Sequence, residues 1–568
     1  MRPTNPVDPQ PSNDPPPLGA WDLRASGRDT SGQGRHARAI GDVAFGPSTD
    51  PLVRSSVARL HATGRLEVDS PWKSLGGFTV AAWVNAAAPA TTVLGDAVSW
   101  YDARSRHGFT LGFEHGSPCG SHGNDRTAWF GVDTASEPRV TDHGKPGDAS
   151  IMVCSLAVFE GSLFASTWEE GPTPQGRVLR LGADAWEDCG APWDANAVTR
   201  LAVHAGALYA GVSRLRGGGS GRDDSANQAP GGHILRYEGG QSWSDMGALD
   251  GADSITALVP FAGTLYAAGM YSEGVFRMDG PRSWRSCGSP GRRLLALGVH
   301  GGALYGAGND HVDAESAIAL TKAGIVVPAR DPSGGGGMFR YDGDEQWASC
   351  GLQRDTTQVY SIETYRRRLH IGTWPTGLVY RADDLEGPNG ATWVSTGRLG
   401  TETEVMNLQS YNGQLYAGTL PHAQVFRYAG DDDWALVATL DETPNVTYRR
   451  AASMALFRGE LFVGTLPSAR VHSIRAGAVA TLDTSVAPGW HHLAGVRDGR
   501  EVRLYVDGVL AATGTGDIGE LMPAHGTPLM LGGGVRADLE GELADVRVWD
   551  RPLDPALIAF IAGAAGHP

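Results

Sequence analysis

The nine residues YNGQLYAGT at 411–419 decide the fold, because six variants of the same phrase stand elsewhere in the chain. Each variant reads as the end of one strand, a short turn, and a second strand of Leu, an aromatic residue and small residues. The repeated Leu stands at 163, 208, 265, 304, 369, 415 and 461, so neighbouring copies are 39 to 65 residues apart. Self-similarity at such a spacing is typical of repeat folds.

Two further strands follow the phrase in most copies. In six copies a short segment carries Arg and a later segment carries Trp, namely Arg180, Arg236, Arg277, Arg340, Arg381 and Arg427, then Trp186, Trp243, Trp284, Trp347, Trp393 and Trp434. Four short strands in each repeat are typical of a β-propeller blade. The seven copies therefore predict a seven-bladed β-propeller over residues 146–484, with the repeated Arg and Trp in structural roles.

The composition agrees with an all-β chain and excludes several function classes. Gly (79) and Pro (34) are abundant among the 568 residues, which suits a chain with many turns. The net charge of −16 argues against nucleic acid as a partner, and no apolar stretch is long enough to cross a bilayer. The N-terminus contains no apolar segment of the kind that a signal peptide needs. We expect a secreted protein whose signal peptide is missing from this sequence, with a cytoplasmic location as the alternative.

Three of the five cysteines, Cys189, Cys287 and Cys350, recur in a phrase of Trp, two residues, Cys and Gly. Equivalent positions in successive blades lie too far apart for a disulfide. The sequence has no CxxC spacing, which argues against a zinc site. We therefore expect these three thiols to be buried as small apolar groups and unpaired with one another.

The two ends of the chain carry strands of a different kind. Near the C-terminus, GWHHLAGVRDGREVRLYVDGVL at 489–510 alternates apolar and polar residues around an Asp-Gly turn, and GELADVRVWDRPLDPALIAF follows at 541–560. Near the N-terminus, GGFTVAAWVNA at 76–86 and TAWFGVD at 127–133 read as strands. Together these motifs resemble the two halves of a laminin-G-like, concanavalin A-type jelly roll.

The resemblance implies one discontinuous β-sandwich with the propeller inserted into it. The expected organisation is a Pro-rich tail at 1–18, the first half of the jelly roll at 19–145, the propeller at 146–484 and the second half of the jelly roll at 485–568. Members of that family often bind glycans, and some hold calcium. The resemblance makes Asp29 a candidate ligand for a structural Ca²⁺, although the sequence itself requires no cofactor.

One face of the predicted propeller gathers residues that suit an acidic sugar. Loops after the second strands and between blades should open there around the central channel. Aromatic rings stack on sugars, and arginines pair with carboxylates. The candidates for proton transfer are His311, His422, Tyr271 and Tyr448, and those for substrate binding are Arg292, Arg293, Arg449, Arg450, Asn309, Trp168 and Trp374. His370 stands where other copies have an aromatic ring, so we expect it in the core.

These residues predict an enzyme that acts on a uronate-containing polysaccharide. The favoured reaction is lyase-type β-elimination, in which His or Tyr moves the proton and Arg neutralises the carboxylate. The architecture is similar to that of propeller polysaccharide lyases, without a stretch diagnostic of one lyase family. The alternatives are a non-catalytic glycan-binding or adhesion protein, a glycoside hydrolase, and a protein-interaction scaffold. The motifs GxSxG and HExxH are absent from the sequence, and a monomer is the default expectation.

Overall fold

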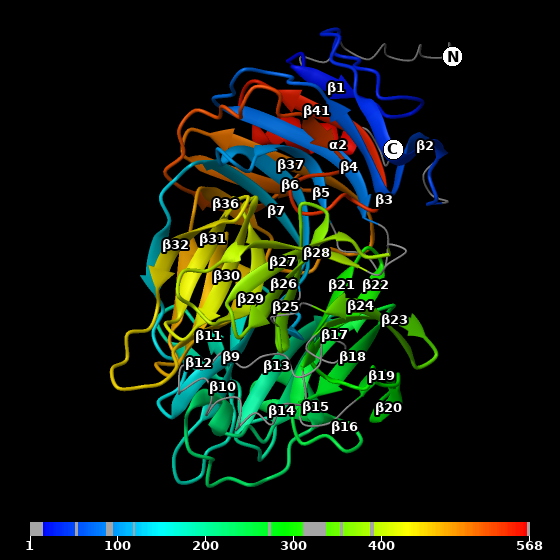
Figure 1. The fold of residues 1–568 in the computed structure, drawn as a ribbon. Coiled ribbons are helices and arrows are strands. Elements are labelled where there is room, and N and C mark those ends of the chain that lie inside the picture. Colours follow the sequence, from blue (N-terminus) through cyan, green and yellow to red (C-terminus); the bar gives the residue numbers. More distant parts are fainter. Residues whose placement is uncertain are drawn as a thin grey trace, which may run out of the picture.

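The computed structural model describes residues 15–50, 55–86, 95–116, 120–270, 274–309, 337–352, 356–386 and 391–564. Nearly all of their regular structure is β-strand, which confirms the predicted all-β fold class. Figure 1 shows a sandwich that holds strands from both ends of the chain, and beside it a ring of sheets from the middle of the chain. No described helix combines the length and apolar character that a bilayer-crossing segment requires.

Strands from the two ends of the chain pair in one curled sheet. β4 (Phe78–Ala86) lies between β37 (Gly489–Asp498) and β41 (Gly541–Trp549), with Trp83 opposite His492 on one side and Ala544 on the other. The order across the sheet is β36 (Ala478–Thr481), β7 (Asn124–Thr134), β6 (His107–Gly116), β5 (Asp96–Asp102), β40 (Leu529–Leu531), β3 (Ser56–Val68), β41 (Gly541–Trp549), β4 (Phe78–Ala86), β37 (Gly489–Asp498), β38 (Glu501–Val506) and β39 (Val509–Thr515). β1 (Gly19–Trp21) adds to β41, and β2 (Arg38–Pro47) adds to β3.

The alternating residues of these strands make one apolar core. In β4, Phe78, Val80, Ala82 and Val84 are fully buried in the same cluster as Leu493 of β37. A short helix, α2 (Pro555–Ala564), packs Ile558 and Ile561 against the outside of the sheet, beside Tyr505. Neither end of the chain could bury its apolar face alone, because the partners of each half come from the other half.

The middle of the chain folds into four-stranded antiparallel units, numbered here from 1. Their strands are, in unit 1, β9 (Ser150–Phe159), β10 (Ser162–Glu169), β11 (Val178–Leu181) and β12 (Trp186–Asp188); in unit 2, β13 (Ala197–His204), β14 (Ala207–Ser213), β15 (His233–Gly239) and β16 (Ser242–Ala248); in unit 3, β17 (Ile255–Phe261), β18 (Thr264–Gly269), β19 (Val275–Gly280) and β20 (Ser283–Ser286); in unit 4, β21 (Arg293–His300), β22 (Ala303–Asn309), β23 (Gly337–Gly343) and β24 (Gln346–Leu352); in unit 5, β25 (Gln358–Tyr365), β26 (Arg368–Trp374), β27 (Leu378–Asp384) and β28 (Thr392–Arg398); in unit 6, β29 (Glu404–Tyr411), β30 (Gln414–Leu420), β31 (Gln424–Gly430) and β32 (Asp433–Thr439); and in unit 7, β33 (Arg450–Phe457), β34 (Glu460–Leu466), β35 (Val471–Arg475) and β8 (Arg139–Asp142). Each first strand contacts the first strand of the next unit, and β33 contacts β9, so the units close into a propeller-like ring.

The fourth strand of unit 7 comes from the part of the sequence that precedes unit 1. β8 precedes unit 1 in sequence but pairs with β35, with His472 opposite Asp142 and Ser473 opposite Thr141. This pairing explains why the seventh copy of the repeat lacks the Trp segment. β36, which follows β35 in sequence, pairs instead with β7 in the sandwich. The ring therefore begins one strand before the expected boundary at 146. The second half of the sandwich begins one strand before the expected boundary at 484.

The repeated Trp and Cys residues join neighbouring units. The indole N–H of a unit's Trp donates to the backbone carbonyl of the Cys in the unit before, at 2.8–2.9 Å, in the pairs Trp243–Cys189, Trp347–Cys287 and Trp393–Cys350. All three thiols are buried and free, which confirms that they are unpaired. Their recurrence in the sequence therefore reflects the packing of one unit against the next.

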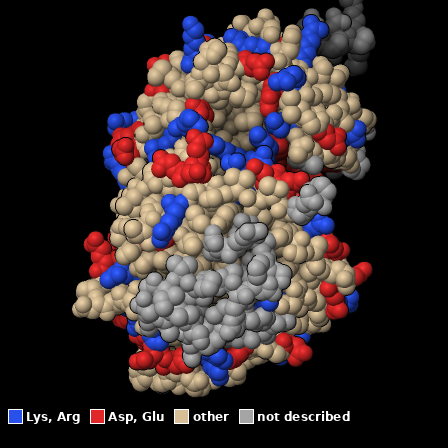
Figure 2. Space-filling view, in the orientation of Figure 1, with Lys and Arg blue, Asp and Glu red and all other residues tan. Residues whose placement is uncertain are grey.

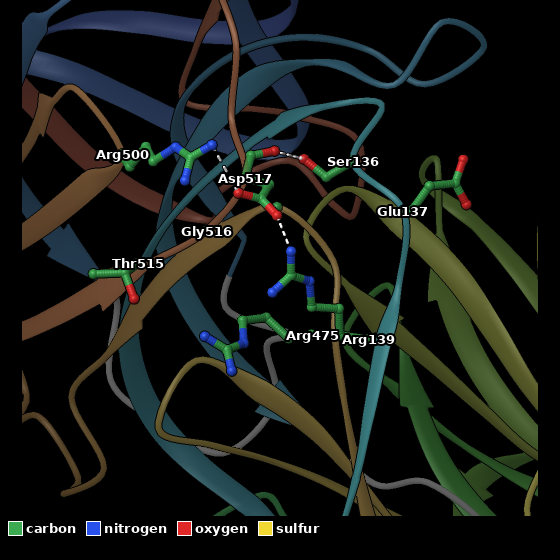
Figure 3. A pocket seen from close by; sticks show the side chains of 9 residues that line it. Ser136, Glu137, Arg139, Arg475, Arg500, Thr515, Gly516 and Asp517 are labelled. Atoms are coloured by element: carbon green, nitrogen blue, oxygen red, sulfur yellow. Dashed lines mark hydrogen bonds and ion pairs between the residues drawn. The ribbon is translucent and has the colours of Figure 1, made fainter.

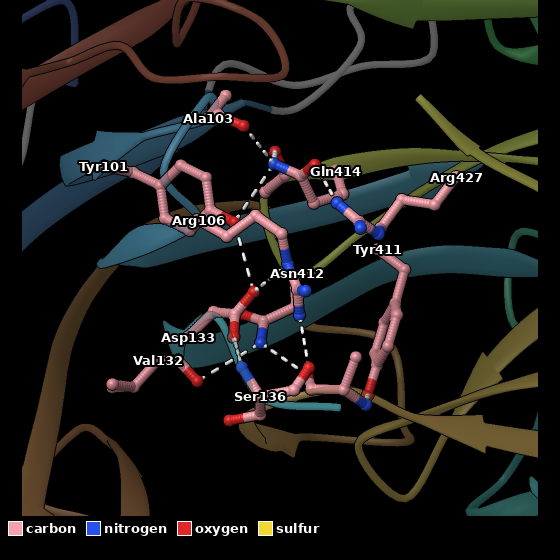
Figure 4. A network of polar contacts seen from close by, with 12 residues as sticks. Tyr101, Ala103, Arg106, Val132, Asp133, Ser136, Tyr411, Asn412, Gln414 and Arg427 are labelled. Atoms are coloured by element: carbon pink, nitrogen blue, oxygen red, sulfur yellow. Dashed lines mark hydrogen bonds and ion pairs between the residues drawn. The ribbon is translucent and has the colours of Figure 1, made fainter. Parts of the chain in front are cut away.

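The sandwich covers the face of the ring that carries the turns between first and second strands. In the turn from β25 to β26, the backbone N–H groups of Arg366 and Arg367 donate to the carbonyls of Val535 (2.7 Å) and Arg536 (2.9 Å). In the next unit, Asn412 donates to the Val132 carbonyl at 3.2 Å, within the polar network of Figure 4. Figure 2 shows charged side chains of both signs along the boundary between the two parts.

Residues 120–124 of the sandwich enter the ring from this covered face. The Asn124 amide donates to the Leu456 carbonyl of β33 at 2.7 Å and accepts from the Leu456 N–H at 2.8 Å. The backbone N–H of His122 donates to the Leu201 carbonyl of β13 at 3.0 Å. First strands surround the axis of a propeller, so this segment lies at the covered end of that axis. The opposite face of the ring is therefore the face on which we expect a ligand site.

Candidate functional site

The described candidates from the ring lie on the face away from the sandwich. In the strand register, Arg293 is opposite Asn309 and Gln358 is opposite Trp374, and Arg450 holds the equivalent place at the start of β33. Each of these residues begins a first strand or ends a second strand. The open face is therefore built from equivalent positions of different units. His311 and Tyr271 lie outside the described residues.

Units 1, 2 and 7 enclose a pocket of about 590 Å³ on this face, called the loop pocket below. It brings Trp168 of unit 1 and Tyr448, which precedes unit 7, to one cavity. Its lining consists of Trp168, Glu170, Gly171, Ser220, Gly221, Arg222, Asp223, Asp224, Ser225, Ala226, Asn445, Val446, Thr447 and Tyr448. Arg292, Arg293, Asn309 and Trp374 belong to units 4 and 5 and do not line it.

One wall of the loop pocket is the Gly- and Ser-rich insertion between β14 and β15. The Asn196 side chain pairs with the backbone of Leu215 through two hydrogen bonds of 2.7 and 2.9 Å. Arg222 forms an ion pair with Glu170 of unit 1 at 2.5 Å. From unit 7, Arg450 donates to the Gly219 carbonyl at 2.6 Å. Contacts to three units therefore fix this insertion as a wall of the pocket.

His422 and Glu402 form a hydrogen-bonded pair at the edge of unit 6. His422 Nδ1 lies 2.5 Å from Glu402 Oε1, and the Glu402 side chain is 0% exposed while that of His422 is 48% exposed. Glu402 Oε2 also accepts from Thr419 Oγ1 at 2.6 Å and from the His422 backbone N–H at 3.2 Å. A buried carboxylate thus orients an imidazole that is about half exposed, the arrangement that general acid–base chemistry uses.

The His422 loop is tied to the strand that carries the candidate arginines. His422 and Arg449 form a parallel bridge, and the Arg449 N–H donates to the Pro421 carbonyl at 2.9 Å. Tyr448 is the neighbouring residue in the chain, so one backbone segment connects the loop pocket to the imidazole. The structure therefore brings four predicted residues together, namely His422, Tyr448, Arg449 and Arg450.

The acid–base properties of this cluster depend on burial. Burial raises the pKa of the Tyr448 phenol, the carboxylate of Glu404 raises it further, and Arg450 acts in the opposite direction. Tyr448 therefore stays protonated at neutral pH and is suited to donate a proton. Burial also raises the pKa of Glu404 to about 7, against the lowering effects of Arg450 and of a hydrogen bond from Tyr360.

Glu404 is a residue that the sequence predictions left out of the site. It begins β29 at the position that Arg450 has in β33 and Arg293 has in β21. Its side chain is buried, and its Oε1 has no hydrogen-bond partner in the described part of the chain. An alignment of the seven copies could have found it, because units 1 to 3 place Met152, Ala197 and Ser254 near that position.

The two indoles predicted to stack on sugars are buried. Trp168 is 1% exposed and Trp374 is 7% exposed, so neither ring presents a free face. Their stacking role stays a prediction, and the geometry gives it no support.

Asn309 is buried as well, and within the described ranges its amide makes no hydrogen bond. On unit 4, Arg293 donates to the Met270 carbonyl at 3.3 Å, and Arg292 is half-buried.

Asp29, the candidate calcium ligand, is engaged by its own turn. Its carboxylate accepts from the backbone N–H groups of Ala20 (3.2 Å), Ser31 (2.9 Å) and Arg35 (2.9 Å). Burial alone would raise its pKa, but these hydrogen bonds outweigh burial and lower it. Among the residues with described positions, no three His, Cys, Asp or Glu side chains gather so as to hold a metal ion. The Ca²⁺ role stays a prediction.

A second hollow, of about 170 Å³, lies where the sandwich meets unit 7 (Figure 3). Asp517 pairs there with Arg139 and, at 3.1 Å, with Arg500. Arg475 pairs with Glu460 at 3.1 Å. The guanidinium groups are thus already matched by carboxylates of the same junction, which makes this hollow a tie between the two parts.

Comparison with known proteins gives a family match at the C-terminal end of the chain. Residues 460–559 match a family model described as the concanavalin A-like lectin/glucanases superfamily, which confirms the concanavalin-like character expected for the C-terminal end. No curated protein matches the chain. Among solved structures, the chain is similar to a catalytically inactive variant of virginiamycin B lyase from Staphylococcus aureus with quinupristin. That likeness has 10% identity and a TM-score of 0.42 and covers 60% of this chain and 99% of the other.

Proposed function

We propose that the protein acts on a uronate-containing polysaccharide by β-elimination, with His422 as the base. The observation that carries this proposal is the pair of an exposed imidazole and a buried carboxylate, His422 and Glu402, at 2.5 Å. With its Nδ1–H donated to Glu402, a neutral His422 keeps the Nε2 lone pair for a substrate proton. Glu402 is then a positioning residue that fixes the ring and its tautomer.

The reaction balances with the residues of the cluster. Nε2 of His422 removes the proton on the carbon next to the uronate carboxylate, and the electron pair forms a carbon–carbon double bond. The glycosidic C–O bond on the adjacent carbon breaks, and Tyr448 gives its proton to the departing oxygen. Arg449 and Arg450 neutralise the charge that develops on the carboxylate.

The proposed organisation is a seven-bladed propeller inserted into a split jelly roll, with the active face turned away from the sandwich. The concanavalin-like part would hold the same polymer, as the lectin/glucanase description of its family supports. A polymeric substrate of this kind is found outside cells, so we propose a secreted protein.

A non-catalytic glycan-binding protein is the second candidate. The lectin part of the same family description favours it. In that case the loop pocket and the sandwich are both recognition surfaces, and His422 contacts the ligand without moving a proton.

The test is incubation of the full chain with a panel of uronate polymers. We expect new absorbance in the band of unsaturated uronates, lost in His422→Ala and reduced in Glu402→Gln with a shifted pH profile. The matched control is His61→Ala, an exposed histidine of β3 where that strand pairs with β2, which should keep full activity. Retention on a glycan column without cleavage identifies the binding protein, and new reducing ends without the absorbance identify a hydrolase.

A further inference from the structure

The loop pocket is acidic, although the arginines next to it suit an anionic sugar. Three carboxylates line it, from Glu170, Asp223 and Asp224, against the single guanidinium of Arg222. Arg222 is already paired with Glu170. Asp223 and Asp224 therefore remain as negative charges on the wall, and both are exposed to the solvent that fills the pocket.

A donor without a partner lies in another wall of the same pocket. Trp168 is 1% exposed, and its Nε1 finds no acceptor among the residues whose positions are described. A buried indole N–H without an acceptor costs free energy comparable to a lost hydrogen bond, so an acceptor from a bound molecule would restore that loss. Ser220, Asn445 and Thr447 add further polar groups to the lining.

We infer that the loop pocket is a subsite for a sugar that carries a free ammonium group. Asp223 and Asp224 would pair with the ammonium, and Trp168 Nε1 would donate to a hydroxyl or ring oxygen of that sugar. In its substrate assignment this inference rests on the proposed function, because the sugar in the pocket would adjoin the uronate at His422. The substrate class is then a polysaccharide in which uronate and unacetylated amino sugar are neighbours.

Carboxylates and arginines beside one another in one site explain such a choice physically. Arg449 and Arg450 favour the carboxylate of one sugar, and the acidic wall favours the ammonium of the next. A polymer with carboxylates alone would meet repulsion at Asp223 and Asp224. The pocket thus supplies discrimination as well as affinity.

Calorimetric titration of the full chain tests the subsite without turnover. The probes are a glucosamine oligomer with free amines and the same oligomer fully N-acetylated, and the protein carries His422→Ala so that nothing is cleaved. We expect the free amine to bind roughly tenfold tighter, the ratio expected of one charge-assisted contact. Equal affinity for the two oligomers, or binding of neither, overturns the inference.

Variants locate the preference within the chain. The double variant Asp223→Asn with Asp224→Asn should abolish the preference for the free amine. Trp168→Phe should weaken the binding of both oligomers by the same factor. The control is Asp432→Asn with Asp433→Asn, two exposed aspartates before or at the start of β32. If the first double variant keeps the preference, the subsite is elsewhere. If the subsite behaves as expected but no uronate polymer is cleaved by the wild type, the proposed function fails and the subsite stands.

Discussion

The two faces of the ring differ in what the repeated sequence does there. On the face under the sandwich, the turns between first and second strands are short and alike. The backbone N–H groups of Arg366 and Arg367 donate there to Val535 and Arg536, and the Asn412 side chain donates to Val132. On the opposite face, the loops differ in length and sequence from unit to unit. The repeat therefore marks what builds the ring, and the departures from the repeat mark the candidate site.

The two faces also differ in how deeply their charged and titratable side chains are buried. At the covered face Arg536 is 1% exposed and pairs with Glu114, and Arg106 pairs with the buried Asp133 at 3.2 Å. At the open face the His422 side chain is 48% exposed. Buried pairs such as those under the sandwich constrain the assembly, whereas exposed groups are available to a ligand.

The largest effect is expected from Arg536→Met at the covered face. The change leaves the carboxylate of Glu114 buried without its cation, which should cost about 3–5 kcal/mol of unfolding free energy. Denaturant unfolding followed by circular dichroism measures the loss. The control is Arg500→Met, which removes an ion pair from an arginine that is 76% exposed and should cost about 1 kcal/mol or less. Equal losses in the two variants would contradict the comparison.

His370→Ala should remove about 2–4 kcal/mol of stability through a cavity within the ring. His370 is buried beside Tyr365, and burial lowers its pKa to about 3, so the lost contribution belongs to a neutral ring. Thermal melting at pH 6 and at pH 8 should show the same loss. His370→Phe should restore stability, since other copies carry an aromatic residue there. A selective loss of turnover with normal melting would place His370 in the site instead.

The contact between ring and sandwich around Glu363 should make the protein less stable as the pH rises toward 8. Burial raises the pKa of Glu363 to about 8, the nearby Glu114 carboxylate raises it too, and Arg536 opposes them. Because the folded pKa lies above the unfolded value of 4.5, the stabilisation is complete at low pH and is lost as the pH rises through 8. Melting temperatures should fall between pH 6 and 8, because the free energy of unfolding drops by at most about 1.4 kcal/mol per pH unit. Glu363→Gln should flatten that slope, and an unchanged slope would disprove the assignment.

Arg450→Ala should weaken a uronate ligand by about 1–2 kcal/mol, the value of a charge-assisted contact reduced by partial exposure. Titration with a uronate oligomer gives the dissociation constant. Arg292→Ala is the matched control, because Arg292 lies at the start of unit 4, whereas Arg450 follows the Arg449 that bridges to His422. If the two variants weaken binding equally, the binding site is spread around the whole open face.

The sequence by itself determined the repeated parts of the molecule. The seven phrases around YNGQLYAGT predicted the ring strands, and the Trp and Cys phrases predicted residues that pack between units. The alternation at 76–86 and 489–510 predicted sandwich strands, and β4 and β37 pair there. Such features are readable because each depends on a local period of apolar residues or on a repeated turn. His422, Tyr448, Arg449 and Arg450 were also proposed from the sequence, as loop residues of types that suit the chemistry, and their roles stay a prediction.

Only the tertiary structure decided which of those residues meet. It supplied β8 as the fourth strand of unit 7, fixed the insertion between β14 and β15 as a wall, and placed Glu402 under His422. It also separated Arg292, Arg293, Asn309 and Trp374 from the loop pocket, although they share its face. These contacts join residues of different units through loops that have no period and no common length. Nothing local in the sequence encodes their distances, because the closure of the ring sets them.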